Sequence, residues 1–376
     1  MMRLDDREWK TFFVGDLFTV KRPAARNKDD YQEGAVPFVA SGSVNNGVMK
    51  CCQPLEGEVL DAAGCITVSP VDGSAFYQPY PFLGRGGAGS SVLMLYKDGI
   101  NLYIGQFIAR MVANTCVGKY TYGHMGNKDS IKRERILLPV TDDGEPDYQF
   151  MEDYIRELIA EKKKQYRRYV KQRIAALCAV PCDQQVDWKS MIDSHDWEPF
   201  QIDTIFNILP GKRLVAADST PGDRPFIGAL DNSNGVARFV SDKNESLDKN
   251  VLGVNYNGNG MVIGFYHPYE CIFSDDVKRF HLKDRADDPF VLLFMKTAIL
   301  MQKQKFGYLY KFNADRMAHT SIMLPVTDSG QPDYDFMESF GRKMMAKKYH
   351  QYLGFLKLND LPSVRTIPLK MNDTPL

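Results

Sequence analysis

The most suggestive catalytic pattern lies in the second half of the chain. His281-x-Lys283 followed by Asp288 has the His-x-Lys-x4-Asp spacing of one class of nucleases, whose chemistry is phosphodiester cleavage. The pattern is short, stands in a charged turn, and has no counterpart near His124 in the first half. We therefore assign no catalytic residue to this chain and keep a self-sufficient nuclease as an alternative hypothesis.

Two further patterns have simpler interpretations. Asp147 with Glu161-x-Lys163 loosely fits the PD-(D/E)xK nucleases, but a lysine replaces the glutamate at the corresponding place in the second half. The glycines at 84, 86 and 89 have dinucleotide-binding spacing, but a β-like segment over 90–96 follows them instead of the required helix. A glycine-rich loop explains this segment better.

Other signatures of catalysis or cofactor binding are missing from the sequence. It contains no Asn/Asp-Pro-Pro-aromatic motif for amino methylation, no glycine-rich methyl-donor loop and no Walker-type Gly-x4-Gly-Lys-Ser/Thr. The seven cysteines lack zinc-type spacing, with Cys51 next to Cys52 and three residues between Cys178 and Cys182. We therefore expect no metal and no cofactor on this chain, so that partners supply any chemistry.

Charge and composition limit the partners. The 376 residues include 47 basic and 47 acidic side chains, so a nucleic-acid binder would have to gather its positive charge on one face. An odd number of cysteines favours reduced thiols over a disulfide framework. Residues 1–10 are charged rather than apolar, and no apolar run is long enough to span a bilayer. We expect a cytoplasmic protein with no membrane contact.

The elements that would position functional residues are duplicated. Shifting the sequence by 188 residues aligns Trp9-x-x-Phe12 with Trp197-x-x-Phe200. Further blocks align at nearly the same offset, namely Pro37-Phe38-Val39 with Pro225-Phe226-Ile227, Asn46-Gly47-Val48 with Asn234-Gly235-Val236, Phe76-Tyr77 with Phe265-Tyr266, and Lys119-Tyr120 with Lys305-Phe306. The block 138–152 differs from 324–338 at only three of its fifteen positions. The chain is a tandem duplication.

Each half contains the same series of predicted elements. Runs at 59–68 and 92–95 predict strands, whereas 107–115 and 289–301 have helical length and apolar spacing. Asp147 and Asp333 follow turn residues and are predicted N-caps of long helices. The predicted division is a first globular domain over 1–147, a first helix over 148–180, a second domain over 181–327, and a second helix with a C-terminal tail over 328–376.

Both long helices carry an apolar stripe at steps of three and four residues. Acidic residues at the start and basic residues further along suit the helix dipole. Such a stripe needs a partner, and the stripe of the other helix is the simplest one. The residues predicted to pack there are Tyr154, Leu158, Ile159, Tyr166 and Val170 in the first helix and Phe340, Met344, Met345, Tyr352 and Leu356 in the second.

These blocks and their layout resemble the specificity subunits of type I restriction–modification systems and the related recognition subunits of type IIB enzymes. The resemblance is carried by the Trp-x-x-Phe-x4-Leu-Phe opening at 9–18, Asn-Asn-Gly at 45–47, the aromatic block at 75–82, and Leu-Pro-Val…Pro-Asp-Tyr-x-Phe-Met-Glu at 138–152. It covers about 9–357 in both halves. The second half departs from it by a poorer aromatic block and by lacking a Gly-Arg-Gly like that at 84–86.

The resemblance implies an α+β fold of two tandem α/β target-recognition domains, each followed by a long helix. It also implies that the two helices pack as an antiparallel coiled-coil spacer, with an internal pseudo-twofold. Each domain would read one half of a bipartite site in double-stranded DNA. The helices would dock two adenine-N6 methyltransferase subunits, which hold S-adenosylmethionine. A restriction or translocase subunit would join them in a type I system.

Candidate DNA contacts are basic, amide and aromatic residues in loop-like or repeated positions. In the first domain they are Lys21, Arg22, Asn45, Asn46, Arg85, Lys119, Tyr120 and Tyr122. In the second they are Lys212, Arg213, Asn232, Asn234, Lys305, Tyr308 and Lys311. The aromatic residues that recur in both halves, Trp9, Phe12, Trp197 and Phe200, are predicted to pack in the cores.

Two alternatives stay open at the level of sequence. The first is a phospholipase-D-like DNA nuclease that uses His281, Lys283 and Asp288. The second is a tandem protein-interaction scaffold without a nucleic-acid role. A scaffold predicts no salt-dependent DNA affinity, whereas a recognition subunit predicts that log affinity falls with log salt.

Overall fold

The computed structural model describes residues 2–87, 89–177, 187–258, 260–307 and 309–358. The chain divides into two compact units, and the division falls between Arg168 and Tyr169. The predicted boundary between residues 180 and 181 and the predicted tail lie outside the described residues. Within that description, no helix has the length and apolar character needed to cross a membrane.

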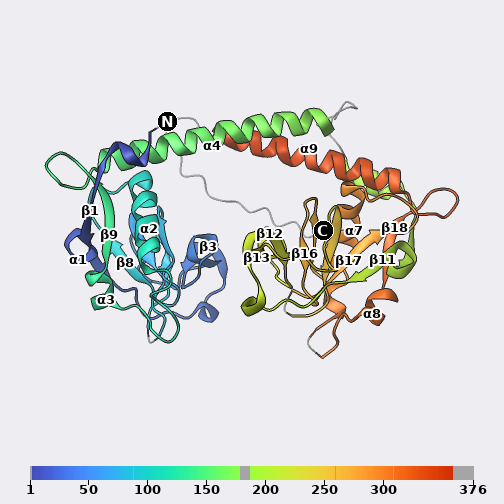
Figure 1. Cartoon of the computed structure of the whole chain (residues 1–376), viewed down its shortest axis with the longest axis horizontal. Coiled ribbons are helices and arrows are strands. Elements are labelled where there is room, and N and C mark those ends of the chain that lie inside the picture. The colour runs from blue at the N-terminus through green and yellow to red at the C-terminus, as the bar shows by residue number, and fades with distance from the viewer. Residues whose placement is uncertain (1, 88, 178–186, 259, 308, 359–376) are drawn as a thin grey trace. The chain divides into compact units, whose positions relative to one another are not determined.

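The first unit is a mixed α and β domain followed by a long helix (Figure 1). Its elements are η1 (Leu4–Asp6), β1 (Glu8–Phe13), α1 (Val14–Leu17), β2 (Thr19–Lys21), η2 (Lys28–Asp30), β3 (Glu33–Val39), η3 (Asn45–Gly47), β4 (Val48–Cys52), β5 (Cys65–Val68), β6 (Ala75–Gln78), β7 (Leu83–Gly84), β8 (Leu93–Tyr96), α2 (Leu102–Cys116), α3 (Lys128–Arg133), β9 (Arg135–Val140) and the start of α4 (Tyr148–Leu177).

The second unit repeats this order. After the last turns of α4 it contains α5 (Trp188–Asp193), β10 (Trp197–Gln201), α6 (Ile202–Ile205), β11 (Phe206–Pro210), η4 (Ala216–Asp218), β12 (Pro221–Ile227), η5 (Ser233–Gly235), β13 (Val236–Val240), β14 (Val251–Asn255), β15 (Gly264–His267), β16 (Ile272–Phe273), β17 (Val277–Leu282), α7 (Pro289–Leu300), η6 (Lys303–Lys305), α8 (Ala314–Ala318), β18 (Ser321–Pro325) and α9 (Tyr334–Leu358).

The sheet topology of the two units is the same. The first has a four-stranded sheet in the order β2-β8-β5-β6, a three-stranded sheet β4-β3-β7 and a ribbon β1-β9, and the second has β11-β17-β14-β15, β13-β12-β16 and β10-β18. Even the register of the ribbons agrees, because Trp9 opposes Pro139 as Trp197 opposes Pro325. The duplication seen in the sequence is therefore a duplication of fold.

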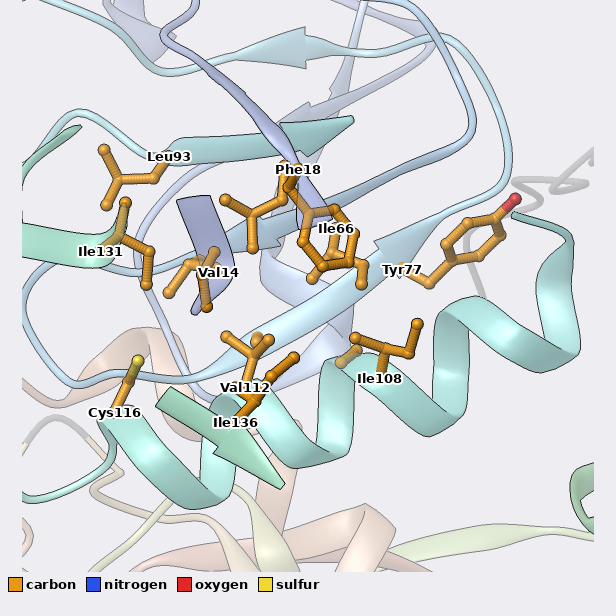
Figure 2. Packing of buried hydrophobic residues seen from close by; sticks show 14 of the residues in the cluster. Val14, Phe18, Ile66, Tyr77, Leu93, Ile108, Val112, Cys116, Ile131 and Ile136 are labelled. Atoms are coloured by element: carbon orange, nitrogen blue, oxygen red, sulfur yellow. The ribbon is translucent and has the colours of Figure 1, made fainter. Parts of the chain in front are cut away.

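The core of the first unit lies between α2 and its four-stranded sheet. Figure 2 shows Ile108 and Val112 of α2 facing Ile66 of β5 and Val14 of α1, and all four side chains are fully buried. Asn101 starts α2 by accepting hydrogen bonds from the amides of Tyr103 and Ile104. Trp9 and Phe12 pack against this core, and Phe200 packs against the matching core of the second unit, as predicted.

One predicted strand was wrong in its first half. The run 59–68 forms a strand only from Cys65 to Val68. Upstream, Asp61 makes an isolated bridge to Phe82 and binds a buried arginine, and Gly64 has a left-handed φ of 78°. These contacts hold the segment as a loop, which the β-rich composition of the run did not reveal.

The N-caps of the two long helices were predicted correctly. The carboxylate of Asp147 accepts a hydrogen bond from the amide of Phe150, and Asp333 accepts one from Phe336. In the second unit, the last turns of α4 lie along α9 in an antiparallel sense (Figure 1). Leu177 clusters with Ala346 and Met345, while the ring of Tyr169 meets that of Tyr349 edge-on at 6.3 Å.

The predicted helix-packing residues fall into two groups. Met345 lies in the cluster with Leu177, and Val170 and Leu356 are buried. Tyr154 and Phe340 pack instead against the domains that precede them, so the prediction for these two was wrong, because the first turns of each helix close their own domain core. Leu158, Ile159, Tyr166 and Met344 are half-buried and Tyr352 is exposed, and their pairing stays a prediction.

Candidate nucleic-acid interface

Two basic loops of the first unit lie next to each other. The loop after β2 carries Arg22, and the loop after β7 carries Arg85; an isolated bridge between Ala25 and Gly86 joins them. A side chain at Gly86 would collide with the carbonyl oxygens of this neighbouring loop, so the approach requires glycine. Arg22 is exposed, and the guanidinium of Arg85 donates to the hydroxyl of Ser90 within its own loop.

Each unit has an asparagine-rich turn between two strands of its small sheet. Asn45 and Asn46 both have left-handed φ angles, of 50° and 57°, and in the second unit Asn234 has a φ of 54°. The amide of Asn46 donates to the Tyr77 carbonyl and that of Asn234 to the Tyr269 hydroxyl, at 3.2 and 2.8 Å. The turns are thus fixed by their own side chains, and Asn45 and Asn232 remain exposed at them.

Tyr120 and Tyr122, both predicted DNA contacts, have opposite environments in the loop before α3. Tyr122 is 84% exposed, whereas Tyr120 is 3% exposed and belongs to the core beneath the loop. The nomination of Tyr120 as a DNA contact was therefore wrong: its ring packs closely under Gly126 and anchors the loop. Lys119 is exposed but its ammonium lies 2.7 Å from a carboxylate oxygen of Glu134.

Lys21, Lys212, Arg213 and Lys305 are exposed cations of the two units. The Lys21 ammonium lies 5.0 Å from the ring centre of Tyr96. Lys212 and Arg213 sit 3.5 Å from carboxylate oxygens of Glu245 and Asp275, across solvent-exposed surface. Lys305 donates to Gln302, Lys311 is half-buried, and Tyr308 lies outside the described residues.

A buried ionic network supports the loops of the first unit. Arg26 donates to Glu58 and Asp61 at 2.6 and 2.7 Å, and the Tyr31 hydroxyl donates to Glu58 at 2.8 Å. Burial alone would raise the pKa of Glu58, but the hydrogen bonds from Arg26 and Tyr31 lower it below its ordinary value. Burial and the same carboxylate raise the pKa of Tyr31 to about 12. Glu58 is therefore ionised at neutral pH, and the Tyr31 hydroxyl keeps the proton that it donates to Glu58.

The second unit keeps this carboxylate but changes its partners. Asp248 bridges to Cys271 as Asp61 bridges to Phe82. It binds Arg279 and Nε2 of His281, each at 2.9 Å. Nδ1 of His281 lies 2.6 Å from Asp287, and the hydrogen bonds that the ring donates to the two carboxylates raise the pKa of His281 to about 9. The carboxylate thus binds an arginine in the first unit, and an arginine together with a histidine in the second.

Comparison with known proteins assigns the duplicated fold. The family model described as "Type I restriction modification DNA specificity domain" matches twice, over residues 6–166 and 194–351. The chain belongs to this family. It is 36% identical over 344 residues to the specificity subunit S.BcgI of a type II restriction enzyme from Heyndrickxia coagulans, covering 90% of this chain and 95% of that one.

Two solved structures are also similar over most of their length. The S subunit of a type I restriction–modification system from M. genitalium is 14% identical with a TM-score of 0.44, and covers 96% of this chain and 95% of its own. The HsdS subunit from Thermoanaerobacter tengcongensis is 10% identical with a TM-score of 0.31, covering 93% and 91%. The family assignment rests on the family model and on S.BcgI.

The chain is thus a non-catalytic DNA specificity subunit, and the nuclease-like patterns have structural roles. Both ring nitrogens of His281 are occupied by carboxylates, and Asp288 caps α7 by accepting from the amides of Phe290 and Val291. Asp147 caps α4, on which Glu161 lies about 20 Å further along the axis. Neither set converges on a reactive centre.

A hollow in the first unit was missed from sequence. It holds about 610 Å³ between η3, β6 and α2, with Asn46, Gln106 and Arg110 among its polar lining and no acidic residue. In the second unit Lys296 stands where Ala109 lies, and its ammonium covers the ring of Phe265 at 5.6 Å. Aligning α2 with α7 by their caps would have revealed this difference between the two domains.

Proposed function

We propose that this specificity subunit reads a bipartite, asymmetric site in double-stranded DNA, one half with each unit. The observation that carries the proposal is one sheet topology occurring twice with different loop chemistry. Similar domains repeated in one chain suit two half-sites at a set spacing. Because the second half has no Gly-Arg-Gly like that around Arg85, and Lys296 stands where Ala109 lines the hollow of the first unit, the two half-sites are expected to differ.

The exposed loop residues supply chemistry suited to DNA. Arg22 and Lys21 at the end of β2 and Lys212 and Arg213 after β11 present positive charge from corresponding places in a chain of zero formal charge. Arginines and lysines of this kind fix register on phosphates, whereas amides such as Asn45 and Asn232 suit base edges. Tyr122 adds a large exposed ring for stacking or apolar contact.

The chemistry of modification belongs to partners in this proposal. Two adenine-N6 methyltransferase subunits per chain would bind beside the spacer helices and hold S-adenosylmethionine, and a restriction or translocase subunit would complete a type I assembly. The proposed recognition domains are 1–147 and 181–327, and the proposed helical parts are 148–180 and 328–376. The apolar positions left partly exposed on α4 and α9 are compatible with such docking.

Selection from a random double-stranded oligonucleotide pool tests the proposal, using this chain purified together with its methyltransferase. We expect enrichment of two unlike half-sites at one fixed gap, with an affinity that falls steeply as salt rises. A folded, assembled complex that enriches no motif and shows no salt-dependent affinity would contradict DNA reading. It would favour the protein-interaction scaffold instead.

A further inference from the structure

Each unit is fastened to the start of its own long helix by the same row of aromatic rings. In the first unit Trp9 stacks on Phe107 at 6.0 Å, and Phe107 meets Tyr154 of α4 edge-on at 5.9 Å. In the second unit the corresponding distances are 6.2 Å for Trp197–Phe294 and 5.5 Å for Phe294–Phe340. We call these two contact regions the first joint and the second joint.

An ion pair laid over a ring also recurs at both joints. Glu152 accepts from Arg156 at 2.8 Å, and the Arg156 guanidinium lies 3.8 Å from the ring centre of Tyr103 at the start of α2. In the second joint Glu338 accepts from Arg342 at 2.8 Å, and Arg342 lies 4.6 Å from the ring centre of Phe290. A guanidinium that is both paired and stacked has few accessible rotamers, so the contact stabilises one orientation of the helix on the domain.

The capping end of each helix is held by a residue just before the first strand of its domain. Arg7 lies 2.8 Å from Asp147 and covers the ring of Phe150. His195, at the corresponding place, lies 3.8 Å from Asp333 and its ring centre is 3.8 Å from that of Phe336. Each joint therefore fixes its helix at three successive points.

The joints differ at one position that controls how closely the helices approach. Ile155 of α4 corresponds to Gly341 of α9. A Cβ atom at Gly341 would lie 2.8 Å from Cβ of Phe290 and 3.1 Å from its carbonyl oxygen. The backbones of α7 and α9 approach each other closely, and α2 meets α4 through side chains such as those of Phe107 and Tyr154. Glycine is required for the closer crossing.

We propose that the two joints set the gap between the half-sites, and that Gly341 is the positioning residue which fixes the second recognition domain at its angle on α9. This inference rests on the proposed bipartite reading. When a domain is held rigidly on its helix, the length and direction of the helix determine where the DNA-reading loops lie. One base pair moves a half-site about 3.4 Å along and about 34° around the duplex. A domain that swivelled on its helix would not discriminate gaps that differ by one base pair.

The test compares gap preference in the assembled complex with its methyltransferase, on duplexes that carry both selected half-sites and gaps varied one base pair at a time. The variants are Gly341→Ile, which copies Ile155, and the smaller Gly341→Ala. The matched control is Gly354→Ile on the same helix, where an added Cβ meets nothing within 4 Å. We expect the preference for the native gap over its neighbours to fall by about tenfold in Gly341→Ile, or to move to another gap.

The readout separates positioning from stability, because partial unfolding lowers binding at every gap equally and leaves their order unchanged. Gly341→Ala is expected to give a smaller change in the same direction, and it carries the test if the isoleucine variant does not fold. Unchanged relative affinities across all gaps in folded Gly341→Ala and Gly341→Ile would overturn the inference. If the unsubstituted complex showed no bipartite motif at all, the proposed function would fail instead.

Discussion

His281 shows how a residue that resembles a catalytic group serves the structure. Its two ring nitrogens face Asp248 and Asp287 at 2.9 and 2.6 Å, and Arg279 shares Asp248. Burial alone would raise the pKa of Asp248, but the hydrogen bonds from His281 and Arg279 lower it. Two carboxylates around one imidazole favour the imidazolium, which donates from both nitrogens.

We expect the stability that His281 contributes to depend on pH. Because its pKa rises to about 9 in the folded chain from 6.5, the contribution is complete below pH 6.5 and is lost as pH rises through about 9. His281→Gln should therefore lower the free energy of unfolding by on the order of 2 kcal/mol at pH 6.5 and by much less at pH 9.5.

Denaturant unfolding at the two pH values measures this difference. His319→Gln is the matched control, because the His319 side chain is largely exposed and its ion pair with Asp315 lies at the surface. An equal loss of stability at both pH values in His281→Gln would contradict the charged-histidine account.

Single residues mark the limit of what the sequence could predict. Tyr120 and Tyr122 are two residues apart in the same loop, yet one is core and the other is exposed, because only the folded loop decides which ring lies beneath it. The partners of His281 come from positions 248 and 287, which no local pattern links. The repeat did predict Trp9 and Trp197 as equivalent packing residues, because both copies conserve a shared core.

At the scale of elements, the residues that cap helix N-termini gave the most reliable predictions from the sequence. Asp147 and Asp333 were predicted as N-caps because a capping side chain acts on amides only two or three residues away. The packing partners of the two long helices were harder to predict. Tyr154 and Phe340 follow the apolar stripe, and spacing alone could not show that they face their own domains.

The start of α7 offers a test of such a cap. Asp288 accepts hydrogen bonds from two amides, as Asn101 does at the start of α2. Asp288→Ala should lower the free energy of unfolding by about 1 kcal/mol, whereas Asp288→Asn, which copies Asn101, should be close to neutral. Chemical denaturation of both variants measures this. Equal destabilisation by alanine and asparagine would contradict a capping role.

At the scale of the whole molecule, the proposed function assigns one half-site to each of the two copies of the fold. Each unit has its own core, its own buried ionic network and its own joint to a long helix. We therefore expect that one domain can change its target while the other keeps its own. The sequence revealed this organisation because duplication leaves matching blocks in order, whatever their local structure.

Exchange of one recognition domain tests this account most directly. We would replace residues 1–147 with the corresponding part of S.BcgI, purify the chimera with the methyltransferase, and repeat the selection from random duplex DNA. The account predicts that one half-site changes while the other half-site and the gap stay as they were. A motif that changes in both halves, or in neither, would contradict the assignment of one half-site to each unit.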